Sequence, residues 1–463
     1  MSLTLPSKVR TANGTTLRLV RELGRGGQGS VYEVEGGRHA VKVLREATSE
    51  RAAEWAVRLK ALRRLPLDGL SIASPIDTLA PPHVGYVMDL LDGLTPLSRL
   101  TSVPAGSRAV EHYRDTGGLR RRLSLLARLA DVLATLHARG LVYQDPSPSN
   151  IFVSELLDRD QVWLIDTDNV SYAGARGRPV YTRRYSAPEL RPGAGRWADS
   201  LSDIFAFTVV AFELLTLDHP FVGDELYEDD EEAEAEALNG SYPWVDHPTD
   251  RSNVSTRGIQ PRGLVLPPAL ESMFRATFVD GLRRRDRRPG AGRWADALRD
   301  AGTSVVPCPA CGLTYQLDLS VERCPWCDEA PRPPTLHVRL LLDLPDGMTP
   351  DHSRPPVADR GELVTVQGDE LRVSRGFVLG RVADPDRLML QLRWEGDHMK
   401  IGNYAGRAIE LVAPDGGKFH TLPHEKVASI RAGRAGEMWS LRLARLGRPN
   451  RWLCFATDPG GRQ

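Results

Sequence analysis

The stretch that decides the fold is residues 141–153, which read LVYQDPSPSNIFV. Its core is D-x-x-x-x-N, made by Asp145 and Asn150, and an apolar strand-like run follows. Residues 163–168, WLIDTD, form a second apolar run that reaches Asp166. The spacing predicts a carboxylate, Asp145, beside a substrate hydroxyl. It also predicts two oxygen ligands, from Asn150 and Asp166, for a Mg²⁺ ion that bridges phosphates.

A glycine-rich stretch lies upstream of these runs. Residues 24–31 read GRGGQGSV and place Gly24, Gly26 and Gly29 in the pattern G-x-G-x-x-G-x-V. Glycine lets backbone N–H groups approach phosphate oxygens without a Cβ in the way. A tight hairpin turn or the glycine loop of a dinucleotide fold would show the same pattern. Residues 30–34 alternate like a strand and do not start a helix, which favours a hairpin lying over a nucleotide.

Lys42 is the second expected phosphate contact. It ends the run HAVK, and only six of the 60 basic residues are lysines, three of them before residue 400. An ammonium on a strand can reach the α and β phosphates, but it needs a carboxylate to hold it. The helix region that follows offers Glu46, Glu50 and Glu54, and we expect Glu54 to be the partner. A solvated helix carboxylate is the alternative.

More motifs follow in a fixed order: T-x-x-Y-x-A-P-E at 182–189, SDIFAF at 202–207, and Arg288-Pro289. With these motifs, residues 17–300 resemble a eukaryotic-type protein kinase domain. The resemblance implies a bilobal α+β fold, with an N-lobe over about 17–92 and a C-lobe over about 93–302. It also implies ATP as a substrate and Mg²⁺ or Mn²⁺ as the catalytic metal.

The resemblance carries site roles to matching positions. Met88 would lie at the back of the adenine pocket, and Asp89 to Leu91 would form the hinge. Glu189 would bind an arginine near Arg288, and Asp203 would anchor the catalytic-loop backbone. The expected catalytic residues are Asp145, Lys42, Asn150 and Asp166. The expected nucleotide contacts are Gly24, Gly26, Gly29, Val31, Ala40, Lys42, Glu54, Met88, Asp89 and Leu91.

Three departures from the family pattern bear on activity. The H-R-D motif is replaced by Tyr143-Gln144-Asp145, so the arginine that commonly reads an activation-loop phosphate is missing. We therefore expect no strict dependence on such phosphorylation. Ser147 stands where Ser/Thr kinases usually have a lysine, which removes a neutraliser of γ-phosphate charge. D-F-G is replaced by Asp166-Thr167-Asp168, and we expect Asp168 to solvate the turn, with a second metal site as the alternative.

Five cysteines indicate a metal site and a lone thiol. Cys308, Cys311, Cys324 and Cys327 form two C-x-x-C pairs, and Cys454 stands apart. Two thiolate pairs at this spacing predict a closed, structural Cys₄ zinc site. The local charges do not form the basic face that DNA binding requires. We expect Cys454 to be a buried residue of the last strand.

The order of parts resembles a narrower bacterial group, the TerY-P group, in which a kinase domain precedes a Cys₄ ribbon. The resemblance rests on the loops at 145–150 and 165–169, on LDHPFVGD at 217–224 and on PWVD at 243–246. It covers about residues 17–330. It implies a von Willebrand A-type protein and a metal-dependent protein phosphatase as partners, in tellurite-resistance and stress-related gene clusters.

Length and composition limit the remaining possibilities. A chain of 463 residues suggests about three domains, which we expect at 17–302 (kinase), 303–330 (zinc ribbon) and 336–460 (β-rich sandwich or barrel). Basic and acidic residues number 60 each, which argues against binding to nucleic acid or to a membrane through bulk charge. An acidic run at 224–236 is expected to be a solvated loop or exposed helix, or less favourably a docking segment. No signal-like or membrane-spanning stretch is present, so we expect a cytoplasmic protein.

The sequence therefore predicts a serine/threonine-type protein kinase that transfers the γ-phosphoryl group of ATP to a protein hydroxyl in bacterial signalling or stress response. The alternative is an ATP-binding pseudokinase that acts as a scaffold through the ribbon and the β-rich region. A small-molecule kinase is the third class. The Ala187-Pro188-Glu189 segment argues against it, because such enzymes often lack a peptide-docking activation segment.

Overall fold

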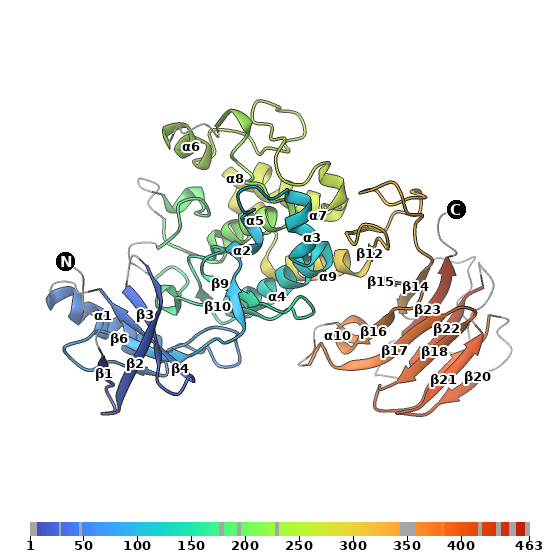
Figure 1. The fold of residues 1–463 in the computed structure, drawn as a ribbon, viewed down its shortest axis with the longest axis horizontal. Coiled ribbons are helices and arrows are strands. Elements are labelled where there is room, and N and C mark those ends of the chain that lie inside the picture. The colour runs from blue at the N-terminus through green and yellow to red at the C-terminus, as the bar shows by residue number, and fades with distance from the viewer. Residues whose placement is uncertain are drawn as a thin grey trace. The chain divides into compact units, whose positions relative to one another are not determined.

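The computed structural model divides the chain into two compact units, residues 1–117 with 121–298 and residues 118–120 with 299–463. Each is described by itself below (Figure 1). The candidate carboxylate Glu46, the side chain of Glu50 and part of the acidic run lie outside the described residues. The structure describes residues 7–26, 29–45, 49–175, 180–191, 196–226, 231–342, 358–380, 382, 384–414, 419–431, 437–443 and 451–458.

The first unit begins with a six-stranded antiparallel sheet and one long helix, α1 (Ser49–Leu62). The strand order is β1-β2-β3-β4-β6-β5, drawn in blue in Figure 1. Tyr32 and Val34 in β3 and Val41 in β4 belong to one buried apolar cluster, which covers one face of the sheet. The strands are β1 (Lys8–Arg10), β2 (Thr16–Arg25), β3 (Gly29–Val34), β4 (His39–Leu44), β5 (Asp77–Thr78) and β6 (Gly85–Asp89).

The rest of the first unit is mainly helical. Its long helices include α4 (Gly118–Ala138) and α5 (Ser200–Thr216). Helix α5 is apolar on nearly all sides and is buried along most of its length, and a capping box of Asp199 and Ser202 fixes its start. The other helices are α2 (Ser98–Thr101), α3 (Ala109–Asp115), α6 (Glu231–Leu238), α7 (Pro268–Arg275), α8 (Gly281–Arg283) and α9 (Ala291–Thr303).

Short strands of the first unit frame the loops that carry the candidate catalytic residues. Strands β9 (Ile151–Ser154) and β10 (Val162–Leu164) form a hairpin, and β7 (Leu94–Pro96) pairs with β9. Strand β8 (Leu141–Val142) pairs with β11 (Ser171–Tyr172). The predicted runs at 141–153 and 163–168 are therefore strand segments whose ends carry the loops with Asp145 and Asp166.

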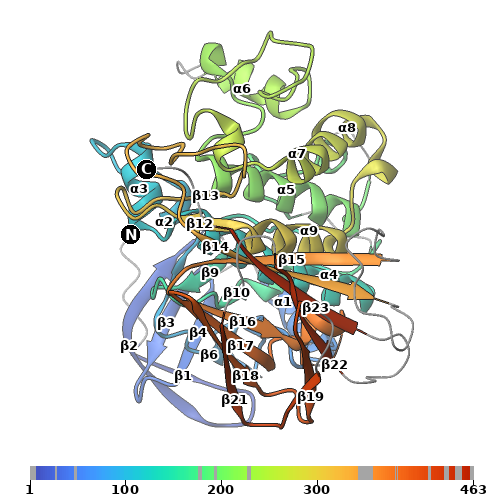
Figure 2. The same cartoon turned by 90° about the vertical axis from the view of Figure 1, so that its right-hand side faces the viewer.

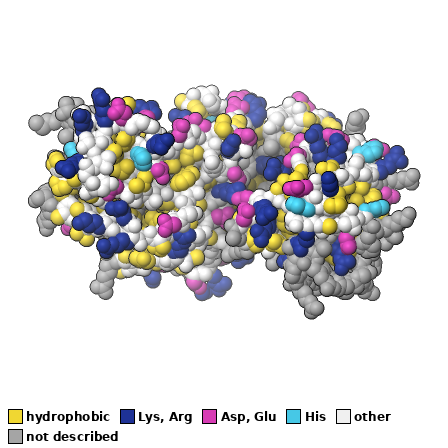
Figure 3. All heavy atoms as spheres, turned by 90° about the horizontal axis from the view of Figure 1, so that it is seen from below, with side chains coloured by type: hydrophobic (Ala, Val, Ile, Leu, Met, Phe, Trp, Pro, Cys, Tyr) yellow, Lys and Arg dark blue, Asp and Glu magenta, His cyan; other side chains and the backbone are white. Residues whose placement is uncertain are grey.

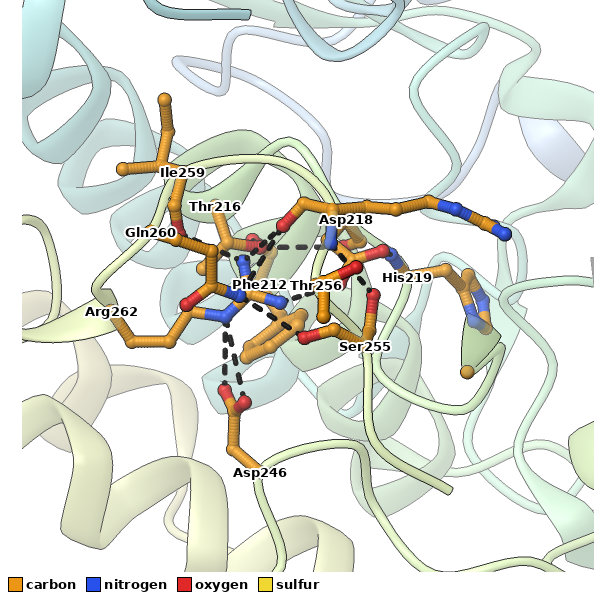
Figure 4. A network of polar contacts seen from close by, with 12 residues as sticks. Phe212, Thr216, Asp218, His219, Asp246, Ser255, Thr256, Ile259, Gln260 and Arg262 are labelled. Atoms are coloured by element: carbon orange, nitrogen blue, oxygen red, sulfur yellow. Dashed lines mark hydrogen bonds and ion pairs between the residues drawn. The ribbon is translucent and has the colours of Figure 1, made fainter. Parts of the chain in front are cut away.

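A buried ion network fixes the segment between α5 and α7. The guanidinium of Arg262 lies 2.5 Å from Asp218 and 3.3 Å from Asp246, and it also donates to the backbone carbonyls of residues 257 and 259 (Figure 4). Burial raises the pKa of Asp246, and the nearby Arg262 opposes that shift. The acidic run ends in α6, whose Glu234 pairs with Arg184. This insert is thus attached to the segment over residues 180–191.

The second unit holds a small hairpin and a β-sandwich. Strands β12 (Val305–Pro307) and β13 (Thr314–Gln316) pair, and the four clustered cysteines lie around them. Val364 of strand β15 (Ala358–Val366) packs into the same apolar cluster, so the hairpin and the sandwich share a core. The predicted limit between ribbon and β-rich region stays a prediction, since both fall in one compact unit.

The β-rich region consists of two antiparallel sheets with one core (Figures 1 and 2). One sheet has the order β15-β14-β23-β22-β19-β20 and the other β16-β17-β18-β21. Alternating residues of both sheets, such as Val338 in β14 and Leu390 and Leu392 in β17, meet in that core. The elements are β14 (Thr335–Leu342), β16 (Glu370–Ser374), α10 (Arg375–Leu379), β17 (Leu388–Glu395), β18 (His398–Asn403), β19 (Ile409–Val412), β20 (Phe419–Leu422), β21 (Val427–Arg431), β22 (Trp439–Leu443) and β23 (Arg451–Asp458).

Three remaining expectations concern the lone thiol, the surface charge and membrane insertion. Cys454 is buried in β23, as the sequence predicts. On the face shown in Figure 3, basic and acidic side chains are interspersed. Within the described part of the chain, no helix is long and apolar enough to cross a membrane.

Candidate active site

The first part of the site is a row of residues across the N-terminal sheet. Lys42 in β4 lies opposite Val31 in β3 and opposite Tyr86 in β6. Two residues along β4, Ala40 lies opposite Met88, and Asp89 is the last residue of β6. Because side chains two positions apart share a face of a strand, Ala40 and Lys42 point to the same side of the sheet. The sheet thus brings together most of the residues expected to contact a nucleotide.

The predicted glycine loop joins β2 to β3 as a hairpin. A Cβ on Gly29 would lie 2.3 Å from the carbonyl oxygen of Val43, so only glycine fits where β3 passes β4. Cβ atoms on Gly24 and Gly26 would meet nothing within 4 Å. Backbone N–H groups beside open space can approach phosphate oxygens. Residues 27 and 28, at the tip, lie outside the described residues.

Lys42 is buried against two carboxylates. Its Nζ lies 3.0 Å from Asp166, and it donates to both oxygens of Asp168 at 2.9 and 3.2 Å. Tyr86 donates its hydroxyl hydrogen to the same Asp168 at 3.1 Å. The Asp168 side chain is fully buried, whereas 31% of the Asp166 side chain is exposed. The expectation that Asp168 solvates the turn is therefore wrong.

Among the described residues, the carboxylates that contact Lys42 are not on α1. Glu54 is exposed on that helix, while the ammonium of Lys42 contacts Asp166 and Asp168. The sequence could not show this difference, because Glu54 has the right spacing from Lys42 and Asp168 is 126 positions away. A pair between Lys42 and Glu54 stays a prediction from the family resemblance.

The second part of the site is the loop over residues 143–150. Asp145 accepts hydrogen bonds from the backbone N–H of Thr182 at 2.7 Å and from its hydroxyl at 3.0 Å. The side-chain amide of Asn150 donates to Asp145 at 3.0 Å. Burial raises the pKa of Asp145, and the hydrogen bonds from Thr182 and Asn150 oppose that shift. The amide nitrogen of Asn150 makes these bonds, so its amide oxygen can serve as a metal ligand.

A buried aspartate on α5 holds the backbone of this loop, as the resemblance implies. Asp203 accepts from the backbone N–H of Tyr143 at 2.7 Å and of Gln144 at 2.8 Å. The Gln144 side chain donates to the carbonyl of Asn169 at 2.6 Å and to Ser171 at 2.9 Å. Gln144 therefore ties the loop to the segment after Asp166 through neutral groups, where an arginine is usual.

The segment over residues 180–191 is tied to the rest of the unit by a bidentate ion pair. Arg288 donates to the two carboxylate oxygens of Glu189 at 2.6 and 3.0 Å, and its side chain is fully buried. Tyr185 donates to Glu213 of α5 at 2.7 Å. Burial raises the pKa of Glu213 to about 7. The resemblance placed an arginine near Arg288 against Glu189, but the Tyr185–Glu213 contact has no signal in the sequence.

The sequence missed three further contributors to the site. Tyr86 donates a hydrogen bond to Asp168, and Asp168 accepts another from Lys42. Thr182 donates to Asp145, although the motif that contains Thr182 predicted no role for it. Strand pairing could have indicated Tyr86, because it lies directly opposite Lys42. The remaining expected nucleotide residue, Leu91, follows β6 and is partly exposed.

The four clustered cysteines form a candidate metal centre in the second unit. Their sulfur atoms all lie within 4.8 Å of one another, and the distances are 3.8 Å for Cys308 to Cys327 and 3.9 Å for Cys311 to Cys324. A tetrahedron with Zn–S bonds of about 2.3 Å has sulfur atoms about 3.8 Å apart. The thiols are not joined as disulfides. The donor set therefore fits one structural zinc ion.

Comparison with known proteins agrees with this geometry. Residues 17–258 match the family model described as "Protein kinase domain". The chain is 33% identical to the serine/threonine-protein kinase Pkn1 of Myxococcus xanthus over 220 residues, which are 44% of this chain and 29% of Pkn1. It is 26% identical to the DNA damage-responsive serine/threonine-protein kinase RqkA of Deinococcus radiodurans over 306 residues, 62% of this chain and 40% of RqkA. The chain thus spans less than half the length of these relatives.

Proposed function

Because the chain belongs to the protein kinase family, we propose that it transfers the γ-phosphoryl group of ATP to serine or threonine hydroxyls of protein substrates. The observation that carries the proposal is the arrangement of Asp145, which is fixed by Thr182 and Asn150 in the catalytic loop. A carboxylate in this place can orient a hydroxyl and accept its proton.

The remaining catalytic groups would hold the phosphates and the metal. Lys42 offers an ammonium for the α and β phosphates, and the open backbone beside Gly24 and Gly26 can approach phosphate oxygens. Asn150 and Asp166 present the oxygen ligands that Mg²⁺ prefers. When bound there, Mg²⁺ would neutralise negative charge on the phosphates.

The resting state of the catalytic loop supports activity without phosphorylation of the activation segment. Gln144 replaces the arginine that would read a phosphate, and it already bonds the segment at Asn169 and Ser171. Thr182 of the segment also donates to Asp145. The described part of the segment is therefore held by contacts that this chain supplies itself.

Narrower features of the function rest on the sequence resemblance. The Cys₄ cluster after the kinase domain is in keeping with the TerY-P group, and a structural zinc ion fits its four sulfur atoms. A role in bacterial stress signalling, and partnership with a von Willebrand A-type protein and a metal-dependent phosphatase, are parts of the proposal that follow from that group. The cytoplasmic location expected from the sequence stays a prediction.

The test is to incubate the purified chain with Mg-ATP and a peptide library that contains serine, threonine and tyrosine acceptors. Mass spectrometry then identifies the modified residues, with the Asp145→Asn variant as the control. We expect phosphoserine and phosphothreonine with the wild type and little product with the variant. ATP binding without transfer to any acceptor or to the chain itself would favour the pseudokinase alternative, to which Ser147 in place of a lysine gives some support.

A further inference from the structure

A buried triad lies beneath the proposed phosphate site, and one of its members has no role in the family pattern. Lys42 is 3% exposed, and Asp168 and Tyr86 are fully buried. All three side chains meet through the hydrogen bonds from Lys42 and Tyr86 to Asp168. A buried ammonium or carboxylate is costly unless it is paired and hydrogen-bonded. Asp168 and Lys42 therefore depend on each other.

The two aspartates beside Lys42 differ in a way that separates their roles. Asp166 has 31% of its side chain exposed, so it can turn toward a metal and remain in contact with water. Asp168 has no exposed side-chain area and is held from a second side by Tyr86. If Asp168 left Lys42, its charge would stay buried without a cation. The Lys42–Asp168 pair is thus the more permanent of the two.

We propose that Asp168 is the positioning residue that holds Lys42 for phosphate binding. The proposal rests on the proposed kinase function and deepens it. In protein kinases, an ion pair between this lysine and a helix glutamate must form before the phosphates are bound correctly. Among the described side chains, Glu54 is exposed, and the carboxylates that contact Lys42 lie in the loop after β10.

The kinetic test compares Asp168→Asn with Glu271→Gln in the full chain. Asparagine has nearly the shape of aspartate but cannot neutralise Lys42. We expect Asp168→Asn to raise the KM for ATP at least tenfold and to leave the KM for the peptide unchanged. The control Glu271→Gln, which removes an exposed carboxylate on α7, should change neither KM by more than about twofold. The proposal is overturned if Glu271→Gln raises the KM for ATP as much as Asp168→Asn does, or if Asp168→Asn changes both KM values alike.

A stability cycle tests the same pair without relying on activity. Lys42→Met leaves Asp168 buried without its cation, so we expect a clear fall in the melting temperature. Lys60→Met, at an exposed position on α1, is the matched control and should leave it unchanged. Adding Asp168→Asn to Lys42→Met should recover at least half of the loss. Additive losses in the double variant would overturn the pairing.

The two measurements separate failure of this inference from failure of the proposed function. If the wild type transfers no phosphate but the stability cycle shows coupling, the kinase proposal fails and the Lys42–Asp168 pair stands. If the wild type transfers phosphate and the cycle is additive, only the positioning role of Asp168 fails.

Discussion

Replacing Gly29 by alanine should destabilise the first unit, because the added methyl group would enter the backbone of β4. The new Cβ would lie 2.3 Å from the carbonyl oxygen of Val43 and 2.9 Å from the Cα of Leu44. The first distance is more than 1 Å short of the 3.4 Å at which ordinary contact begins. Strand β4 must therefore move, and the residue that meets the new Cβ, Val43, directly follows Lys42.

The size of the effect follows from this clash. Overpacking in a well-packed region costs about 1–3 kcal/mol, and we expect the upper part of that range because the obstacle is backbone. The first unit has about 295 residues, so at about 2.1 cal/mol/K of unfolding entropy per residue, 1 kcal/mol shifts its melting temperature by about 1.6 °C. Gly29→Ala should thus lower the melting temperature of the first unit by roughly 3–5 °C.

Gly26→Ala is the matched control, because a Cβ there meets nothing within 4 Å. It should leave the melting temperature within about 1 °C and weaken ATP binding if the loop backbone approaches the phosphates. Thermal denaturation of both variants, with and without Mg-ATP, separates the effects. An unchanged melting temperature for Gly29→Ala, or an equal fall for Gly26→Ala, would refute the reasoning.

Three further predictions concern buried charges and the metal site. Burial raises the pKa of Glu213 to about 7. The preference of the folded state for the protonated carboxyl therefore stabilises the protein fully below about pH 4.5, and this stabilisation is lost as the pH rises through about 7. Melting temperatures at pH 5 and pH 8 should therefore show a decline in the wild type that is smaller in Glu213→Gln, and equal declines would contradict this. Arg288→Ala removes the bidentate partner of Glu189 and leaves only Arg285, 3.6 Å away, as a nearby cation, which should cost about 1–3 kcal/mol, with Arg288→Lys costing less; equal melting temperatures for wild type and Arg288→Ala would disprove it. Elemental analysis should find about one zinc per chain, and chelation should alter the fluorescence of Trp326, which packs beside the cysteines; a metal-free chain with an unchanged spectrum would rule out the structural role.

Local pattern was enough to predict the frame of the site. The apolar runs around Asp145 and Asp166 are strand segments, and the region that was expected to be β-rich consists of two sheets. These features depend on residues close in sequence, so periodicity and motif spacing report them. The Cys₄ cluster was predictable for the same reason, because two short C-x-x-C turns define it.

Features set by contacts between distant segments were not predictable. The stretch RPGAGRWAD shows this most clearly, because it occurs twice, at residues 191–199 and 288–296. Its second copy lies at the start of α9 and buries Trp294 completely, whereas Trp197 in the first copy precedes α5 and is 44% exposed. The same local sequence therefore occurs in two different tertiary environments, which local patterns do not reveal. Asp168 is a second case, because its burial depends on Lys42 and Tyr86, which lie on other elements.

The most direct test of the central claim is the single-turnover rate of γ-phosphoryl transfer from Mg-ATP to a serine or threonine peptide, with ATP affinity measured in parallel. Removing the carboxylate in Asp145→Asn should slow transfer by about 10²–10⁴-fold, the contribution typical of a general base, while ATP affinity changes little. Equal transfer rates for the wild type and Asp145→Asn at equal ATP affinity would contradict the assignment of Asp145 and, with it, the account of this site.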